Sequence, residues 1–246
     1  MSGLQELQKK MYEIEWELKP LAHAYLLAVK NEQQRKNLKK KLERQGYEHH
    51  MLDILIARAR EDKEEVAKEI RSLVVKHIVW QEWLSKIKGV EAVTAGLLLG
   101  LVPARKYENV SKLWAHVGLA PPKYYEETGK VPNMRCKFVV LLIAHNITRV
   151  GRRTRGSWYY MKFREFYEYE KQKSPDLSED HLFLRARRRL AKLFTGHYFE
   201  VYRKLLGLPC PQPYFAVKGL HTYIPPHIDK GVPEPVPYTP VPKVRA

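Results

Sequence analysis

Residues 84–100 read L-S-K-I-K-G-V-E-A-V-T-A-G-L-L-L-G, and this stretch decides how the middle of the chain folds. An apolar pair, Leu84 and Ile87, leads into a turn centred on Gly89, and small and apolar residues follow from Ala92 to Leu99. This order predicts a helix-hairpin-helix. The turn of such a unit points backbone N–H groups outward at the start of a helix, where the helix dipole also favours an anion. We therefore expect a phosphate-binding turn that contacts DNA without reading its sequence.

The chain carries a large positive charge. Its 246 residues include 44 Lys and Arg against 27 Asp and Glu, a formal net charge of +17. Residues 86–216 hold 24 of the basic and 11 of the acidic side chains, so the excess lies in the same region as the predicted hairpin. Such an excess favours nucleic acid as the partner, ahead of an anionic membrane surface.

The sequence indicates an intracellular protein. No run of 18 apolar residues is present, and the first ten residues lack the apolar core of a signal peptide. Cys136 and Cys210 are far apart and suggest no disulfide framework. We expect no membrane partner and a cytoplasmic location, nucleoid-associated in a cell or else encoded by a virus or mobile element.

Residues 1–83 are predicted to form a helical arm. Pro20 is expected to break or kink a first helix, a second helix is expected from 21 to 45, and a third starts near Tyr47. An apolar stripe at spacings of three and four marks the first of these: Leu4, Leu7, Met11, Ile14 and Leu18. The arm is either an antiparallel helical hairpin or coiled coil that makes a dimer, or an ordinary packing unit. We expect it to mediate self-association, so that the protein is a homo-oligomer, a dimer.

Residues 84–207 are predicted to form a helical domain around the hairpin. Asn109 or Ser111 caps a short helix that ends at Gly118, and Asn133 caps a longer one. The Pro121-Pro122 pair predicts an extended exit into a polar loop over 123–132. A last helix is expected from about Ser178 to Leu206.

The predicted fold class is all-α. The arm comes first, the hairpin-containing helical domain follows, and residues 208–246 form an extended tail that holds ten of the 16 prolines.

Several motifs occur in an order that resembles one protein family. They are I-K-G-V-x-x-V-T-A-G-L-L-L-G at 87–100, Y-E-N-V-S-K-L-W-A-H-V-G-L-A-P at 107–121, T-G-K at 128–130 and a helix with N-x-x-x-K at 133–137. Together they resemble the C-terminal transposase domain of the DEDD insertion-sequence transposases, the bridge-RNA-guided recombinases. The resemblance covers about residues 84–150 and implies DNA binding at Gly89, Val90, Thr94 and Ala95. The helical arm likewise resembles the coiled coil between that family's two domains.

The chain departs from this family in its catalytic parts. The family's nuclease domain carries four acidic metal ligands on a mixed sheet, whereas residues 1–85 read as helix. The family's nucleophile is a serine, but here Thr128 lies nearest to that place and no serine occurs between Ser111 and Ser157. Glu91 also replaces the second glycine of the usual G-x-G turn. We therefore expect no catalytic residue, with Thr128 as the one candidate, and no metal or cofactor.

The candidate DNA contacts are the hairpin residues and the basic side chains that follow them. They are Lys88, Gly89, Val90, Thr94, Lys130, Arg135, Arg149, Arg152, Arg153, Arg155, Arg185, Arg187, Arg188 and Arg189. The clusters R-V-G-R-R-T-R and R-A-R-R-R either contact phosphates or are solvated helix faces. The aromatic residues of 158–170 either pack, as their helical spacing favours, or stack on unpaired bases. The ten histidines show no zinc spacing.

These features lead to one leading hypothesis and two alternatives. The leading one is a non-catalytic protein that binds the backbone of double-stranded DNA, with structured RNA left open as a further partner. One alternative is a transposase or recombinase subunit that needs a nuclease domain supplied in trans. The other is an architectural coat subunit of a nucleoprotein.

Overall fold

The computed structural model describes residues 3–154, 156–211 and 223–229, and these contain helices and no strand, as predicted. The helices are α1 Gly3–Arg44, α2 His50–Val74, α3 Ile78–Glu82, η1 Leu84–Lys86, α4 Ala92–Leu101, η2 Ala104–Lys106, α5 Val110–His116, α6 Pro122–Thr128, α7 Met134–Thr154, α8 Trp158–Lys173 and α9 Glu179–Leu205. Most of the predicted Pro-rich tail lies outside the described residues.

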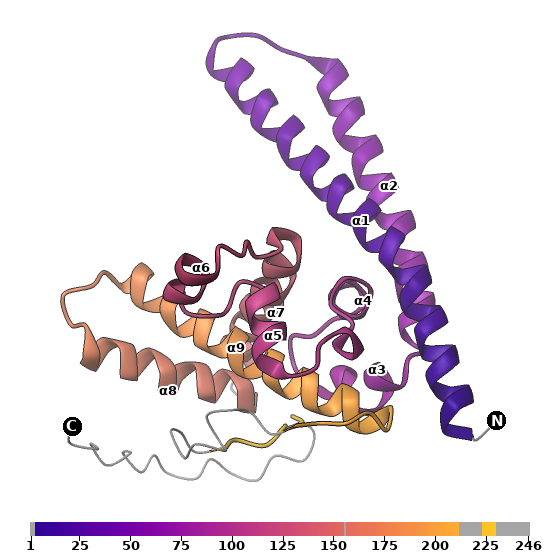
Figure 1. Ribbon diagram of the computed structural model, residues 1–246. Coiled ribbons are helices and arrows are strands. Elements are labelled where there is room, and N and C mark those ends of the chain that lie inside the picture. Colours follow the sequence, from indigo (N-terminus) through magenta and orange to yellow (C-terminus); the bar gives the residue numbers. More distant parts are fainter. Residues whose placement is uncertain (1–2, 155, 212–222, 230–246) are drawn as a thin grey trace.

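Helices α1 and α2 run antiparallel and form an arm that projects beyond the globular part of the molecule (Figure 1). The predicted break at Pro20 is wrong, because α1 continues through it to Arg44. Proline removes one helical hydrogen bond. The neighbouring side chains of Leu18 and Ala22 are fully buried, and this packing holds the helix together on both sides of the proline.

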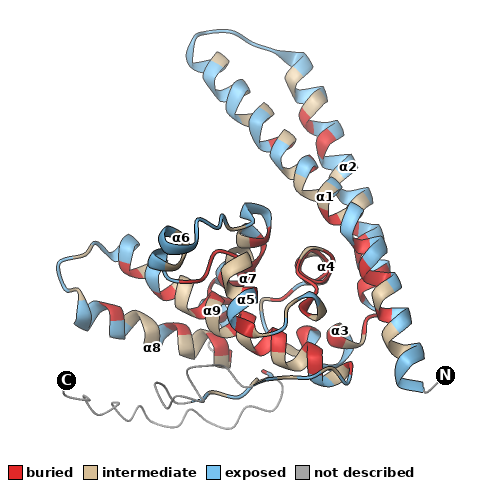
Figure 2. Cartoon of the chain, in the orientation of Figure 1, coloured by how far each residue is buried: buried red, intermediate tan, exposed pale blue. Residues whose placement is uncertain are grey.

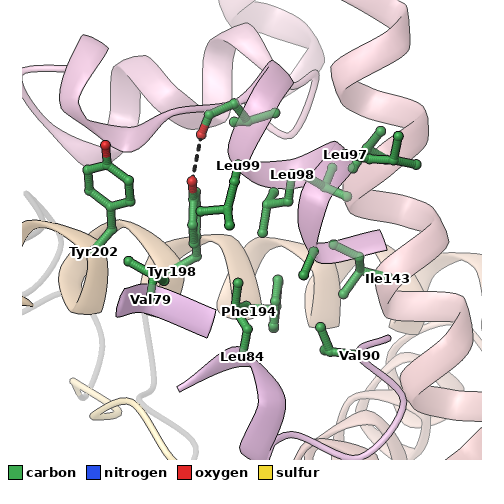
Figure 3. Close-up of a cluster of buried hydrophobic side chains, with 14 of the residues drawn as sticks. Val79, Leu84, Val90, Leu97, Leu98, Leu99, Ile143, Phe194, Tyr198 and Tyr202 are labelled. Carbon is green, nitrogen blue, oxygen red and sulfur yellow. Dashed lines mark hydrogen bonds between the residues drawn. The ribbon is translucent and has the colours of Figure 1, made fainter. Parts of the chain in front are cut away.

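Helix α4 is the centre of the core. It contacts α1, α2 and α7, and every residue from Thr94 to Gly100 is buried (Figures 2 and 3). Two glycines four residues apart make this possible. A Cβ atom on Gly96 would lie 2.2 Å from Cγ2 of Ile70 in α2, and one on Gly100 would lie 2.9 Å from the backbone of Leu18 in α1. Both helices of the arm therefore pack directly against the α4 backbone.

Helix α9 supports the other side of the core. Phe194, Tyr198 and Tyr202 of α9 are fully buried, and the Tyr198 hydroxyl donates to the carbonyl of Val102 over 2.9 Å (Figure 3). Along its length α9 contacts α3, η2, α5, α7 and α8. It thereby connects the hairpin region to the C-terminal helices.

The loop predicted over 123–132 is partly wrong, because α6 occupies its first half. Pro121 is extended, as predicted, but Pro122 opens the helix at a position where the missing N–H costs nothing. Gly129 ends it in the left-handed conformation, with φ of 65°. The Tyr125 hydroxyl donates to the carbonyl of Ala115 over 2.9 Å and holds α6 against α5.

The predicted helix starts are confirmed at three positions. Asn109 accepts from the N–H of Lys112 over 3.0 Å, so Asn109 and not Ser111 caps α5. Asn133 accepts from the N–H of Cys136 at the start of α7, and Ser178 caps α9.

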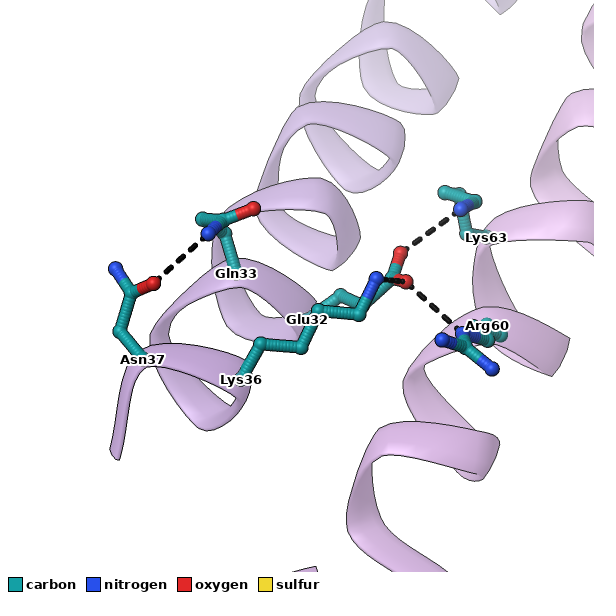
Figure 4. A network of polar contacts seen from close by, with 6 residues as sticks. All are labelled: Glu32, Gln33, Lys36, Asn37, Arg60 and Lys63. Atoms are coloured by element: carbon teal, nitrogen blue, oxygen red, sulfur yellow. Dashed lines mark hydrogen bonds and ion pairs between the residues drawn. The ribbon is translucent and has the colours of Figure 1, made fainter. Parts of the chain in front are cut away.

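A buried carboxylate holds the outer half of the arm together. Glu32 of α1 pairs with Lys36 at 2.5 Å, with Lys63 of α2 at 2.8 Å and with Arg60 of α2 at 3.0 Å (Figure 4). The hydrogen bonds from Lys36 and Lys63 lower the pKa of Glu32 to about 2. The carboxylate thus joins three cations that would otherwise repel one another.

We predict that Glu32→Gln destabilises the arm by about 2 kcal/mol, because three cations then face each other without a carboxylate. Amide hydrogen exchange in the outer half of α1 should accelerate. The control is Glu17→Gln, the same change at an exposed position of the same helix. Equal exchange rates in the two variants would show that the Glu32 ion pairs add nothing to the arm.

We also predict that Gly96→Ala destabilises the protein by about 2 kcal/mol or more, because the new methyl group overlaps Ile70. Urea unfolding measures this change. Gly196→Ala in α9 is the matched control, since the nearest atom to a Cβ there is 3.3 Å away and alanine favours the helix. Similar losses at both positions would contradict the proposed packing of α4.

Candidate nucleic-acid interface

The predicted glycine turn lies between η1 and α4, and one side of it packs against α7. Gly89 has a φ of 94°, and a Cβ atom there would lie 2.6 Å from the Cα of Ile147. Only glycine fits this position. The turn is therefore fixed in place by the helix behind it, which the sequence did not indicate.

The hairpin candidates are mostly buried. Val90 and Thr94 are each 7 % exposed, and Ala95 is fully buried. The Thr94 hydroxyl accepts from the N–H of Glu91 over 3.2 Å and donates to the Glu91 carbonyl over 2.8 Å, so it caps α4. Lys88 has an exposed side chain, whose ammonium donates to the carbonyl of Gly156 over 2.8 Å.

The backbone N–H of Lys88 in this turn is not free for an external phosphate, contrary to the prediction, because the chain supplies its own anion. The N–H of Lys88 donates to Oδ2 of Asp229 over 2.6 Å, and the N–H of Trp158 donates to Oδ1 over 2.6 Å. The Ser157 hydroxyl donates to Oδ2 over 3.2 Å. In return the N–H of Asp229 donates to the carbonyl of Lys86 over 3.0 Å. A buried N–H without an acceptor is costly, and Asp229 removes that cost.

Asp229 belongs to an extended segment, residues 223–229, which we call the C-terminal strap. The indole N–H of Trp83 donates to the carbonyl of His227 over 2.9 Å, and the His227 ring stacks on Trp158 with centroids 4.7 Å apart. The Tyr223 hydroxyl donates to the carboxylate of Glu200 over 2.6 Å. The strap thus crosses α9, the hairpin region and the start of α8.

His197 joins the strap to the core. Its Nε2 is 2.9 Å from the carbonyl of Ile224, and its Nδ1 is 2.8 Å from the Tyr159 hydroxyl. A carbonyl only accepts, so Nε2 carries the proton and Nδ1 accepts from Tyr159. Burial lowers the pKa of His197 to about 4, and the ring is neutral at pH 7.

A groove of about 600 Å³ opens between α7, α8 and the start of α9, and we call it the arginine groove. Its lining residues are His145, Thr148, Arg149, Arg152, Tyr160, Phe163, Arg164, Tyr167, Glu168, Glu179, Asp180 and Phe183. Gly151 allows α7 to approach α8 closely, because a Cβ atom there would lie 2.3 Å from Cβ of Tyr160.

The arginines of this groove lack carboxylate partners. Arg149 and Arg152 on α7 and Arg164 on α8 are exposed, and so is the neighbouring Arg153. Among the described residues none of the four takes part in an ion pair, even though three carboxylates line the same groove. Their charge is therefore available to an external anion.

The arginines of α9 are mostly used inside the molecule. Arg188 donates to the carbonyls of Gly118 and Ala120 over 2.9 Å each and fixes the connection between α5 and α6. Arg189 pairs with the buried Glu170, and Arg185 lies 3.6 Å from the same carboxylate. The guanidinium of Arg187 lies over the ring of Phe183 at 5.9 Å. These contacts give the R-A-R-R-R cluster a structural role.

The remaining candidates lie apart from the groove or outside the described residues. Lys130 and Arg135 are exposed near α6 and the start of α7, where Nη1 of Arg135 is 3.0 Å from Nδ1 of His23. Thr128 lies at the end of α6, and its hydroxyl donates to the carbonyl of Tyr124 over 2.6 Å. Arg155 lies outside the described residues.

The described part of the chain contains no group of three or more His, Cys, Asp and Glu placed to hold a metal ion. Burial raises the pKa of the Cys136 thiol to about 11, so this cysteine is not a reactive thiolate at neutral pH. In the same ranges no helix has the length and apolar content needed to cross a bilayer.

The sequence prediction missed two residues of the candidate interface, Arg164 and Asp229. Arg164 shares one face of α8 with Tyr160 and Tyr167, and this spacing of four and three residues is a signal that was readable. Asp229 gave no signal, because its partners lie more than 70 residues away in sequence.

No family model matches the chain, and no curated protein matches it.

We predict that the protein loses stability as the pH falls from about 6.5 to 4, by up to about 3 kcal/mol from His197 alone. The sign follows because the unfolded chain binds a proton at His197 in this window and the folded chain does not. Urea unfolding at pH 7 and pH 4.5 measures the difference. His197→Gln should reduce it, whereas His50→Gln at an exposed position should not. An unchanged difference in His197→Gln would refute this explanation.

Proposed function

We propose that this chain is a non-catalytic nucleic-acid-binding protein that contacts the phosphate backbone of duplex DNA through the arginine groove. The observation that supports it best is the set of exposed arginines without ion pairs, Arg149, Arg152 and Arg153 on α7 and Arg164 on α8. A guanidinium matches the oxygens of a phosphate in shape and charge. Unpaired arginines on adjoining helices suit a ligand with regularly spaced negative charges.

The placement of these arginines supports contact with a backbone. Arg149, Arg152 and Arg153 lie within about 6 Å along the axis of α7, and duplex DNA carries one charge per about 1.7 Å of its axis. The formal charge of +17 adds a general attraction to such a polyanion. The resemblance of residues 84–150 to a DEDD transposase C-terminal domain points the same way.

The proposal does not include catalysis. Among the described residues, Thr128 has no histidine or carboxylate hydrogen-bonded to its hydroxyl, which instead donates to a backbone carbonyl. A threonine nucleophile needs a base or a metal to remove its proton. A nuclease chain that supplies such a group in trans remains the alternative hypothesis for this residue.

The aromatic side of the groove favours a second candidate ligand, unpaired nucleotides. Tyr160, Tyr167 and Phe183 are half-buried there, around the buried ring of Phe163. Such rings stack on exposed bases, and the carboxylates of Glu179 and Asp180 could accept from base amino groups. Duplex and single-stranded DNA of equal length therefore need to be compared directly.

We predict that the double variant Arg149→Ala/Arg152→Ala weakens duplex binding by about tenfold or more and reduces the salt slope by about 2, since each phosphate contact contributes about 0.9 to that slope. Fluorescence anisotropy of a labelled 20-base-pair duplex between 50 and 300 mM KCl measures both.

Arg58→Ala is the control, because this exposed arginine lies on α2 and makes no hydrogen bond or ion pair through its side chain among the described residues. It should change the affinity less than twofold. Binding that is independent of salt, or equally weakened by the control, would contradict the proposed function. Tighter binding of the single strand that is lost in Tyr167→Ala would favour the second candidate.

A further inference from the structure

The carboxylate of Asp229 lies in a ready-made oxyanion site. Two backbone N–H groups from separate segments, those of Lys88 and Trp158, reach its two oxygens over 2.6 Å each, and the Ser157 hydroxyl adds a third bond. Trp158 is the first residue of the 16-residue helix α8, whose dipole favours an anion at this end. Asp229 is only 6 % exposed, so its carboxylate fills the space between these donors.

Contacts other than those of Asp229 also hold these donors in place. The turn that carries Lys88 is fixed by the contact of Gly89 with α7, and Ser157 caps α8 by accepting from the N–H of Tyr160. Two N–H groups and a hydroxyl are donors that suit a phosphate as well as a carboxylate. The ammonium of Lys88 lies beside them on Gly156 and adds positive charge.

We propose that the N–H groups of Lys88 and Trp158 and the hydroxyl of Ser157 form a phosphate-binding site, which Asp229 occupies in cis. The C-terminal strap then competes with a backbone phosphate of the nucleic acid for the same donors. The nucleic-acid part of this inference rests on the proposed function, whereas the anion site itself does not.

The position of the site connects it with the arginine groove. Ser157 and Trp158 follow Arg153 within five residues, at the point where the connection from α7 enters α8. This is the end of the two helices at which Gly151 contacts Tyr160. A nucleic-acid strand that contacts the last turn of α7 thus passes close to the covered donors.

A phosphate can replace the Asp229 carboxylate as the acceptor of the three hydrogen bonds from Lys88, Ser157 and Trp158. The described residues of the strap form no helix, and Tyr223 and Ile228 remain 43 % and 37 % exposed. A tethered carboxylate competes at an effective concentration in the millimolar range, and a strand already bound by several arginines gains a comparable advantage. When the strap covers the site in most molecules, the apparent affinity for the nucleic acid equals the intrinsic affinity multiplied by the fraction of molecules in which the strap is displaced.

The first test compares Asp229→Asn with Asp176→Asn. Both variants remove one negative charge, but Asp176 lies exposed in the connection between α8 and α9, and its side chain makes no hydrogen bond or ion pair among the described residues. Asp229→Asn should bind the 20-base-pair duplex about five- to tenfold more tightly than the wild type, and Asp176→Asn less than twofold more tightly. Equal gains in the two variants would overturn the inference, because the charge alone would then explain them.

The second test needs no nucleic acid. Inorganic phosphate is titrated into ¹⁵N-labelled Asp229→Ala protein, and the amide resonances of Lys88 and Trp158 are followed by NMR. They should shift in a saturable manner in this variant and remain in place in the wild type. The absence of any shift would overturn the anion site, even if the arginine variants had confirmed the proposed function.

A third variant covers the case in which substitution of Asp229 disturbs the fold. His227→Ala removes the ring stacked on Trp158 and leaves Asp229 and the donors unchanged. Its helix content by circular dichroism should match that of the wild type, and its duplex affinity should rise by about two- to threefold, because a larger fraction of molecules is open. An unchanged affinity in a folded His227→Ala protein would count against displacement of the strap.

The outcomes separate the two proposals. If the arginine variants weaken binding and Asp229→Asn behaves like Asp176→Asn, the proposed function is supported and competition by the strap is contradicted. If no variant binds the duplex but phosphate shifts the amide resonances of Lys88 and Trp158, the proposed function is contradicted and the anion site is supported.

Discussion

The close approach of α4 to both helices of the arm is the constraint on which the rest of the structure depends. Gly96 and Gly100 leave no room for a side chain between α4 and its neighbours. A buried polar cluster reinforces the same junction, because the Glu15 carboxylate of α1 accepts from Arg105 over 2.8 Å and from the Tyr202 hydroxyl. The arm, the hairpin turn and α9 are therefore held in one arrangement, and the donors at Lys88 inherit their positions from it.

Local chemistry made part of this fold predictable. The caps at Asn109, Asn133 and Ser178 follow from short-range hydrogen bonds, so sequence sufficed to place them. Two errors in the helix assignment, at Pro20 and over 123–132, occurred where tertiary contacts outweigh a local preference. Burial of the residues beside Pro20 keeps α1 continuous, and the hydrogen bond from Tyr125 to α5 stabilises a helix where a loop was expected.

The candidate site was less predictable, because the sequence shows which residues are charged but not which of them are already bonded inside the protein. A count of arginines gives the α7 and α9 clusters equal weight, but the structure engages those of α9 with buried partners such as Glu170 and the carbonyl of Gly118. No rule of spacing anticipates this. The hydrogen bond between Lys88 and Asp229 joins residues 141 positions apart, so it too becomes visible only in the folded chain.

The length of α1 gives the arm a mechanical property. From its contact with Gly100 at Leu18 to its end at Arg44, α1 extends about 39 Å, and the base of this lever lies inside the core. Over this length, a rotation of about 5° at the base moves the tip by about 3 Å. Conversely, a load at the tip acts with that leverage on α4, which directly follows the turn at Gly89. The arm and the turn at Gly89 are thus mechanically connected through α4.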